Sequence, residues 1–416
     1  MRIESKRTWL CFCASVLFLP LFPALGALGL LVTMAVVGRR NYHQLIRGYL
    51  PRAWGILALI LLVTTILADK PAAAGLGLAN FLPFFALFLV LRNLITKPIQ
   101  LRQLSWCLVL PSLPIVLLGF AQMYVAWDSP PLIETILGWE LVPGGFPPGR
   151  MSSVFIYTNF LAIYLAIAIA LTLGLWLAAW QQKITKKRTQ ILALLGLILL
   201  ADTSGLILTS SRNAWGIVVF CLMAYAAYLG WSWLVWLFTG AISVTLWAAF
   251  APSWGGSLLR IVVPSFIWMR LADTAYERPL ATLRITQWQF CWDLITERPF
   301  WGWGLRNFSL LYEAKMNLWL GHPHNLFLML GAEAGIVALF LLSGIVGAIA
   351  YSGCKLLATW SSPESPSIFF SYLVAFAACI LFNLADVSIF DLRINTLGWI
   401  LLAAISGVAS STSEQK

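Results

Sequence analysis

The sequence predicts an all-α, polytopic membrane protein, and three observations carry this prediction. The chain has 416 residues, of which 60% are hydrophobic and 10% are charged, whereas about a quarter of the residues in a typical soluble domain are charged. Apolar stretches of about 20 residues recur along the chain, as expected of helices that cross a hydrocarbon core of roughly 30 Å. Basic residues gather in alternate connections between these stretches, which follows the positive-inside rule.

The apolar stretches predict about 12 transmembrane helices. The first run is either one long helix or a hairpin of two short helices. A hairpin fits better, because Pro20 and Pro23 interrupt the run and basic residues flank both of its ends. The predicted spans are 8–20, 22–38, 53–68, 77–91, 104–126, 153–180, 189–209, 213–229, 231–250, 324–352, 367–387 and 393–409.

An even number of spans places both termini in the cytoplasm. In this topology residues 1–250 form spans one to nine, residues 251–322 form one large outer loop, and residues 323–416 form the last three spans and a short cytoplasmic tail. The net charge of +11 is then explained by the basic inner loops. We therefore expect membrane lipids, and no nucleic acid, as surroundings of the basic residues.

The large outer loop has a helical pattern of its own. Apolar residues recur at helical spacing through residues 284–299, with polar residues on the other side, and Pro299 ends the pattern. This predicts an amphipathic helix at the membrane surface or over the mouth of the bundle. A second helical run, 305–318, leads to the segment that contains two of the three histidines of the chain.

Charged and titratable residues gather at the outer ends of the spans. They are Arg150, Arg212, Arg284, Arg306, His322, His324 and, about two turns inside the tenth span, Glu333. A single arginine at such a depth is often only an interfacial anchor. Four arginines from separate segments, beside two histidines, favour an anion site, because guanidinium groups grip phosphate and imidazole exchanges protons near neutral pH.

Two further expectations concern the carboxylates. Acidic clusters with metal-ligand spacing are absent from the outer loops, so we expect a mechanism without a metal and without a cofactor. At the last outer turn, we expect Asp386, Asp391 and Arg393 to pair locally.

Four short motifs follow one another along the chain, at 149–155 with 158–162, at 208–215, at 284–288 with 298–308, and at 324–328 with 333–335. Together they resemble the motifs of the O-antigen ligase and O-antigen polymerase (Wzy-type) superfamily of bacterial membrane glycosyltransferases. The likeness covers about residues 148–400. The last turn, 386–390 with 395–399, is similar to a cyanobacterial branch of the superfamily that is labelled as inorganic-carbon transport proteins.

The resemblance implies a glycosyltransferase in the bacterial inner membrane, with the outer loop in the periplasm. It implies a lipid-diphosphate donor of undecaprenyl type and a glycan or lipid acceptor with a free hydroxyl. We expect Arg212, Arg284, Arg306 and Arg150 to bind the diphosphate. His324 is the expected catalytic base and His322 the second candidate, and Glu333 and Asn325 are expected to support them.

Two other functions stay open at this stage. A transporter component for bicarbonate or another anion would need a polar path across the whole membrane, whereas the charged candidates gather at one face. A non-catalytic assembly partner would tolerate substitutions in the outer loop. The sequence leaves open the sugar, the acceptor, the oligomeric state and the choice between ligase and polymerase.

Overall fold

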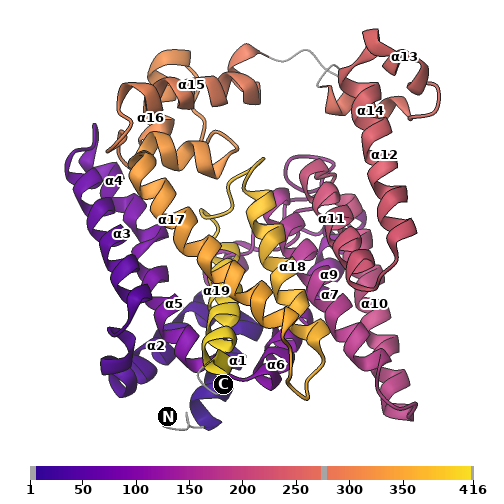
Figure 1. The fold of residues 1–416 in the computed structure, drawn as a ribbon. Helices are drawn as coiled ribbons and strands as arrows, with labels where there is room; N and C mark the ends of the chain where they lie inside the picture. Colours follow the sequence, from indigo (N-terminus) through magenta and orange to yellow (C-terminus); the bar gives the residue numbers. More distant parts are fainter. Residues whose placement is uncertain (1–5, 273–278, 414–416) are drawn as a thin grey trace.

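The computed structural model describes residues 6–272 and 279–413, and the regular elements in this part of the chain are helices (Figure 1). Residues 1–5, 273–278 and 414–416, which include both ends of the predicted topology, lie outside the described residues. The first elements are α1 (Lys6–Phe18), α2 (Pro23–Leu45), α3 (Tyr49–Ile66), α4 (Pro71–Gly77), η1 (Leu78–Asn80), α5 (Leu82–Leu94), α6 (Pro98–Val109), α7 (Ser112–Tyr124), α8 (Pro131–Leu137), α9 (Thr158–Trp180), α10 (Lys186–Leu208), α11 (Arg212–Tyr228) and α12 (Ser232–Phe250). The remaining elements are η2 (Pro252–Trp254), α13 (Gly256–Leu259), α14 (Ser265–Leu271), η3 (Leu280–Thr282), α15 (Arg284–Glu297), α16 (Asn307–Met316), α17 (Leu326–Ala358), α18 (Pro366–Phe382) and α19 (Leu392–Ser413).

The helices confirm the all-helical membrane architecture. Within the described residues, nine helical segments are long and apolar enough to cross a membrane, and α18 is a shorter apolar helix. Each of the twelve predicted spans overlaps a helix. However, α1 has 13 residues and α11 has 17, fewer than the roughly 20 that a straight crossing needs. The count of twelve crossings therefore stays a prediction.

The first apolar run is a pair of helices. The backbone N–H of Phe22 donates to the carbonyl of Phe18 at 2.7 Å, in a turn between α1 and α2, and the two helices pack against one another. Pro23 is the first residue of α2, where its missing N–H costs nothing.

The chain ends and the large loop lie at opposite ends of the bundle. Figure 1 shows the N- and C-termini at one end, with α15 and α16 at the other. This arrangement agrees with a large loop between α12 and α17. Which end faces the periplasm stays a prediction.

The centre of the bundle is α9. Its sequence is apolar on every side, as in a helix that is buried all round, and most of its residues are buried. It packs against α18 and α10. Since α9 begins at Thr158, its first turn carries Asn159, and the segment just before it carries Arg150.

The long helix α17 is broken at Gly335, which has φ 80° and ψ 164°. A break leaves backbone groups of the helix without partners, and the segment 299–304 between α15 and α16 supplies them. Trp303 N–H donates to the Ala332 carbonyl at 3.0 Å, Gly304 N–H to the Glu333 carbonyl at 2.8 Å, and Ile336 N–H to the Pro299 carbonyl at 2.8 Å. The outer loop is thereby fixed to the membrane helix that follows the histidines.

This junction has no room for a side chain. A Cβ atom on Gly335 would lie 2.1 Å from the carbonyl oxygen of Phe300, and one on Gly302 would lie 2.5 Å from the backbone of Glu333. Both glycines also have positive φ, a conformation that glycine adopts without steric cost. The motifs that contain Gly302 and Gly335 therefore pack against one another, and each needs a glycine at the contact.

Gly335→Ala is expected to destabilise the protein, by about 1–3 kcal/mol from the backbone conformation alone and further through the clash with Phe300. The measurement is the midpoint of thermal unfolding of the purified protein in detergent. Gly344→Ala is the matched control, because a Cβ there meets nothing within 4 Å and the helix is regular. Equal midpoints for the two variants would contradict the role of the junction.

Candidate functional site

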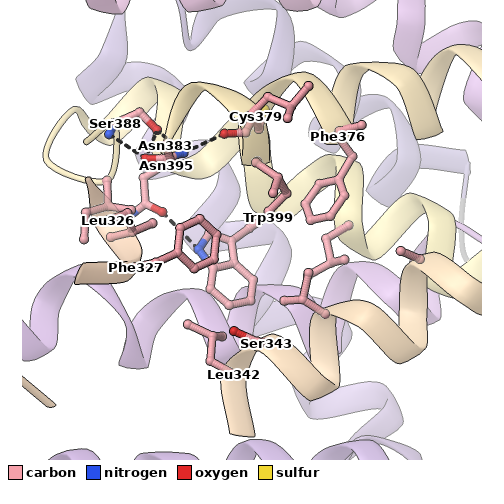
Figure 2. A pocket seen from close by; sticks show the side chains of 18 of the residues that line it. Leu326, Phe327, Leu342, Ser343, Phe376, Cys379, Asn383, Ser388, Asn395 and Trp399 are labelled. Atoms are coloured by element: carbon pink, nitrogen blue, oxygen red, sulfur yellow. Dashed lines mark hydrogen bonds between the residues drawn. The ribbon is translucent and has the colours of Figure 1, made fainter. Parts of the chain in front are cut away.

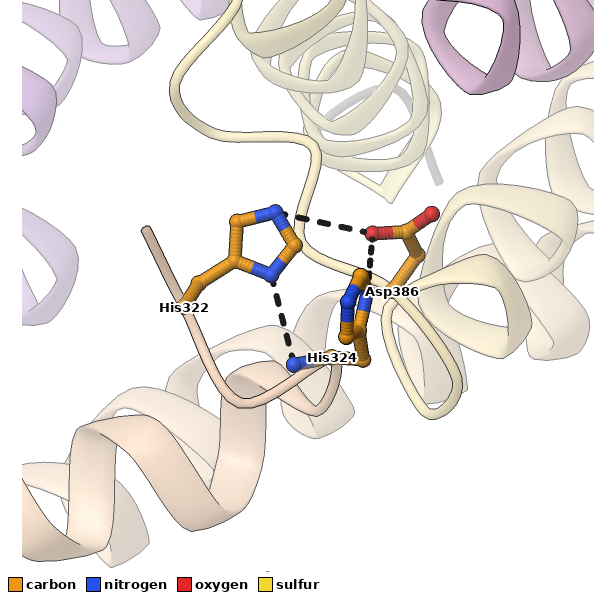
Figure 3. Close-up of side chains that lie close together, drawn as sticks. All are labelled: His322, His324 and Asp386. Carbon is orange, nitrogen blue, oxygen red and sulfur yellow. Dashed lines mark hydrogen bonds and ion pairs between the residues drawn. The ribbon is translucent and has the colours of Figure 1, made fainter. Parts of the chain in front are cut away.

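Two histidines and one aspartate form the centre of the site (Figure 3). Nδ1 of His324 lies 3.2 Å from Oδ1 of Asp386, and Nε2 of His322 lies 3.7 Å from the same oxygen. The side chains of His322 and His324 are 17% and 23% exposed, and that of Asp386 is 2% exposed. We refer to these three residues as the His–Asp cluster. Its buried carboxylate faces two imidazoles that solvent still reaches.

The cluster is assembled from two connections that are far apart in the sequence. His322 and His324 precede α17, and Asp386 lies between α18 and α19. Asn325 joins the two connections: its Oδ1 accepts the N–H of Leu328 at the start of α17, and its Nδ2 donates to the carbonyl of Leu384, both at 3.0 Å. The residue predicted to support the histidines is therefore the N-cap of α17 and a link to the turn that carries Asp386.

The expected local pairing at the last outer turn is half right. Arg393 and Asp391 form a buried ion pair, with Nη2 2.9 Å from Oδ2, and Arg393 also donates to the carbonyl of Val154 at 2.9 Å. Asp386 does not join this pair and faces the histidines instead. The prediction was wrong for Asp386. It considered only residues near Asp386 in the sequence, whereas the partners of Asp386 come from the histidine loop before α17.

Electrostatics in the cluster favour an ionised Asp386 beside neutral imidazole. The pKa of His322 is lowered to about 4: burial is the main cause, the charges of His324 and Arg284 also lower it, and the charge of Asp386 raises it. Burial would raise the pKa of Asp386, but the hydrogen bond with His324 and the neighbouring His322 hold this pKa below its ordinary value. At neutral pH His322 is therefore neutral and Asp386 is charged.

Arg150 belongs to the same hydrogen-bond network. Its Nε donates to the Thr209 carbonyl at 2.8 Å and its Nη2 to Oδ1 of Asn159 at 3.0 Å. The amide of Asn159 in turn donates to Oδ2 of Asp386. Of the four predicted arginines, Arg150 is thus joined to the cluster through one intervening side chain, and it also fixes the position of that side chain.

Arg284 lies close to the histidines because α15 docks on their loop. The indole Nε1 of Trp288 donates to the carbonyl of Pro323, the residue between the two histidines, at 3.0 Å. Arg284 is one turn earlier, and its positive charge acts on both His322 and Tyr157. Its side chain is exposed, so the guanidinium group is free to meet a ligand.

A cavity of about 790 Å³ opens beside the cluster and includes Arg306. Its lining residues are Ala73, Leu76, Asn80, Tyr157, Phe160, Arg306, Ser309, Leu310, Trp319, Leu320, Gly321, His322, His324 and Phe390. We refer to it as the polar cavity. Arg306 and His324 both have positive φ, 59° and 53°. Such conformations are uncommon outside glycine and are concentrated at functional sites.

Glu333 supports Arg306 rather than facing the cavity. Its carboxylate is buried and accepts the backbone N–H of Phe308 at 3.1 Å. The first N–H groups of a helix lack partners within that helix, so this hydrogen bond to Glu333 fixes the start of α16 next to Arg306. Glu333, predicted to support the histidines, instead supports the start of α16.

Arg212 begins α11 and is exposed. Among the residues that the structure describes, those that line the polar cavity do not include Arg212. Its neighbour Asn213 donates to the carbonyl of Phe382 at 3.0 Å, four residues before Asp386. The start of α11 is therefore next to the turn of the His–Asp cluster, and a role for Arg212 at the diphosphate stays a prediction.

The His–Asp cluster also has the composition of a metal site, since one ligand atom from each residue lies within 4.8 Å of the others. One hydrogen bond argues against this use. Nδ1 of His322 accepts the backbone N–H of His324 at 3.2 Å, so the ring proton is on Nε2, the nitrogen that faces Asp386. A histidine that binds metal through Nε2 instead carries its proton on Nδ1, so these residues fit a metal poorly.

Sequence reasoning missed that Asp386 faces the two histidines, and it missed that Asn159 links Asp386 to Arg150. Asn159 lies in the 158–162 motif and Asp386 in the 386–390 motif. The physical signal for Asp386 as a site residue is a carboxylate in an apolar turn, because a charge at such a place is costly unless it has a function or a partner.

Residues 197–343 match a family model described as O-Antigen ligase. The matched region includes Arg212, Arg284, Arg306, both histidines of the cluster and Glu333, and covers part of the 148–400 region of predicted likeness. No curated protein matches the chain. This match confirms, over residues 197–343, the predicted likeness to the O-antigen ligase/polymerase superfamily.

Proposed function

We propose that this protein transfers a glycan from a lipid-diphosphate donor of undecaprenyl type to an acceptor hydroxyl at the outer face of the bacterial inner membrane. The observation that carries the proposal is the His–Asp cluster, whose two histidines line a cavity together with Arg306. These histidines and Arg306 lie in the region that matches the O-antigen ligase family model. In this orientation both chain termini are cytoplasmic.

His324 acts as the general base. Asp386 accepts a hydrogen bond from Nδ1 of His324, which leaves Nε2 for the acceptor hydroxyl. As the hydroxyl oxygen forms its bond to the anomeric carbon, its proton passes to Nε2, and the bond from that carbon to the diphosphate oxygen breaks. The electron pair leaves with the diphosphate. The charge of Asp386 stabilises the imidazolium that forms.

The arginines stabilise the diphosphate as its negative charge grows. Arg284 is exposed beside the histidines, and Arg306 lines the cavity. A cation placed before the reaction at the site of developing charge supplies a large part of the rate enhancement in such chemistry. Arg150 is less free, because two of its nitrogens are already hydrogen-bonded, and its main part is to hold Asn159 against Asp386.

The test uses purified protein in liposomes with an undecaprenyl-diphosphate-linked oligosaccharide and a glycan acceptor. We expect transfer, and we expect it to persist with a metal chelator in excess. One added unit per acceptor would indicate a ligase and a ladder of products a polymerase. Absence of transfer, together with bicarbonate uptake by the same liposomes, would instead favour the transporter alternative.

A further inference from the structure

Asp202 is a buried carboxyl group that the proposed mechanism does not use. It lies in α10, six residues before the last residue of that helix, Leu208, and its exposed fraction is 0%. Among the residues that the structure describes, none forms a hydrogen bond with either of its carboxyl oxygens. A charged group within the membrane is costly, and a buried polar group without a partner needs a physical explanation.

Asp202 is separate from the cavities beside the other end helices. The described residues that line the polar cavity do not include it, nor do those that line an apolar cavity of about 550 Å³ between α17, α18 and α19 (Figure 2). Instead, α10 packs against α9, α7 and α11. A Cβ atom on Gly205, one turn after Asp202, would lie 3.0 Å from Val116 of α7 and 3.2 Å from Leu165 of α9. Such close packing leaves little room for water around the carboxyl group.

Next to Asp202, a membrane span is interrupted by a proline. Helices α6 and α7 together form one span, Pro98–Tyr124, and Pro111 lies at the break between them. Because Pro111 has no N–H, carbonyl groups of the preceding turn lose their usual partners. The hydroxyl of Ser112 replaces one such partner by donating to the carbonyl of Val109 at 2.9 Å. Side-chain hydroxyls commonly compensate for a break of this kind within a membrane.

Two hydroxyl groups near Asp202 already donate their hydrogens elsewhere. The oxygen of Ser112 is within reach of the carboxyl group, but its hydrogen is donated to Val109. Tyr164 of α9, which interacts electrostatically with Asp202, donates its hydrogen to the carbonyl of Leu108 at 3.2 Å. Both hydroxyl oxygens therefore present lone pairs, which accept a hydrogen bond and repel a carboxylate. This arrangement suits a carboxyl group that carries a hydrogen of its own.

Other titratable groups on the helices around α10 have different surroundings. Apart from Tyr164, the charged or titratable residues of these helices are Tyr124 on α7 and Arg212, Cys221, Tyr225 and Tyr228 on α11. Tyr124 and Arg212 are exposed, and the other three residues face α9 or α18. A proton is then the species that neutralises Asp202 within this packing.

We propose that Asp202 is a proton-binding site: the folded protein holds this carboxyl group protonated at neutral pH, and the carboxyl hydrogen is donated to the oxygen of Ser112. The hydrogen bond joins α10 to the break in the Pro98–Tyr124 span. The site lies among the membrane helices and is independent of the proposed function.

The proton at Asp202 also supports the segment that carries Arg150, through α7. Oε1 of Gln122, in the last turn of α7, accepts the N–H groups of residues 152 and 153 at 3.1 and 2.8 Å. Without its proton, the charged Asp202 would draw the hydroxyl hydrogen of Ser112 away from the carbonyl that it satisfies. The break from which α7 begins would then loosen, and with it the support of the Arg150 segment.

The first test is the infrared absorption of the purified full-length protein at neutral pH, in a detergent without carbonyl groups. A protonated carboxyl group has a C=O band that is separate from the carboxylate bands and shifts in heavy water. We expect wild type to show a band that Asp202→Asn lacks. Ser112→Ala should shift this band without removing it, because the carboxyl group loses its acceptor. Loss of a carboxylate band in Asp202→Asn, or neutral carboxyl bands that both variants leave unchanged, would overturn the proposal.

The second test is the midpoint of thermal unfolding at increasing pH. The folded protein holds a proton that the unfolded chain releases above an ordinary pKa of about 3.9, so the wild-type midpoint should fall by a few degrees per pH unit as the pH rises through neutrality. Asp202→Asn keeps a neutral side chain and should show a smaller decline. Asp391→Asn is the matched control, because Asp391 is also buried but is paired with Arg393 at 2.9 Å. This control should be less stable and keep the wild-type decline.

Two results of the second test count against the proposal. Equal declines in wild type and Asp202→Asn would show that Asp202 holds no proton that the unfolded chain releases. A metal cation is the other species that one carboxylate and neutral oxygens bind, so the midpoints are also compared in sodium and in potassium chloride at equal ionic strength. We expect no difference between the salts. A midpoint that sodium raises in wild type but not in Asp202→Asn would assign the carboxylate to sodium and overturn the proton site.

Discussion

Replacing His324 with alanine is expected to lower the rate of glycan transfer by about 10²–10⁴-fold, the usual contribution of a general base. The physical reason is the loss of the only group of the cluster that the proposed mechanism places at the acceptor hydroxyl. The measurement is transfer by purified, reconstituted variants at saturating donor, with the amount of each variant in the membrane determined in parallel.

Three further variants make this result specific. His43→Ala changes an exposed histidine at the opposite end of the bundle and should leave transfer unchanged. Asp386→Asn keeps the shape of the side chain but removes its charge, so a fall smaller than that of His324→Ala is expected. His322→Ala should also lower the transfer rate less than His324→Ala does. If His324→Ala kept wild-type activity while His322→Ala lost it, the assignment of the base would have to be exchanged.

The sequence predicts the membrane helices well because the physical signal is local. Each predicted span overlaps a helix, since a run of apolar residues in hydrocarbon has few alternatives to a helix. The lengths of α1 and α11, 13 and 17 residues, equal those of the predicted spans 8–20 and 213–229, but both are shorter than a straight crossing of the membrane needs.

The candidate site is predictable only in part, since its contacts join segments far apart in the chain. The histidines and arginines stand out in the sequence because charge is rare in it. Asp386 does not stand out, because its partners are about sixty residues away and the loop that brings them together is placed by Asn325 and by the glycine junction at Gly335. Glu333 was singled out for its depth, but its partner, the start of α16, appears only in three dimensions.

Arg284 is expected to be the arginine whose loss costs most. Arg284→Ala should lower kcat/KM for the lipid-diphosphate donor by about 10²–10³-fold, comparable to the loss of one preorganised donor at a developing charge. Arg284→Lys should recover only part of this, because lysine keeps the charge and loses the planar fork that grips phosphate oxygens in pairs. Arg52→Ala is the control, since Arg52 is an exposed arginine on α3, outside the site.

The separate effects of the Arg284 substitution on kcat and on KM show whether Arg284 acts in catalysis or in substrate binding. Arg284 begins α15 and is held over the histidine loop by the bond from Trp288 to Pro323, so its position is set before substrate arrives. A preorganised cation that matches charge appearing only in the transition state should lower kcat with little change in KM. A rise in KM with kcat unchanged would show that Arg284 merely holds the ground-state diphosphate. The catalytic cation would then be Arg306, whose conformation the buried Glu333 fixes at the cavity wall.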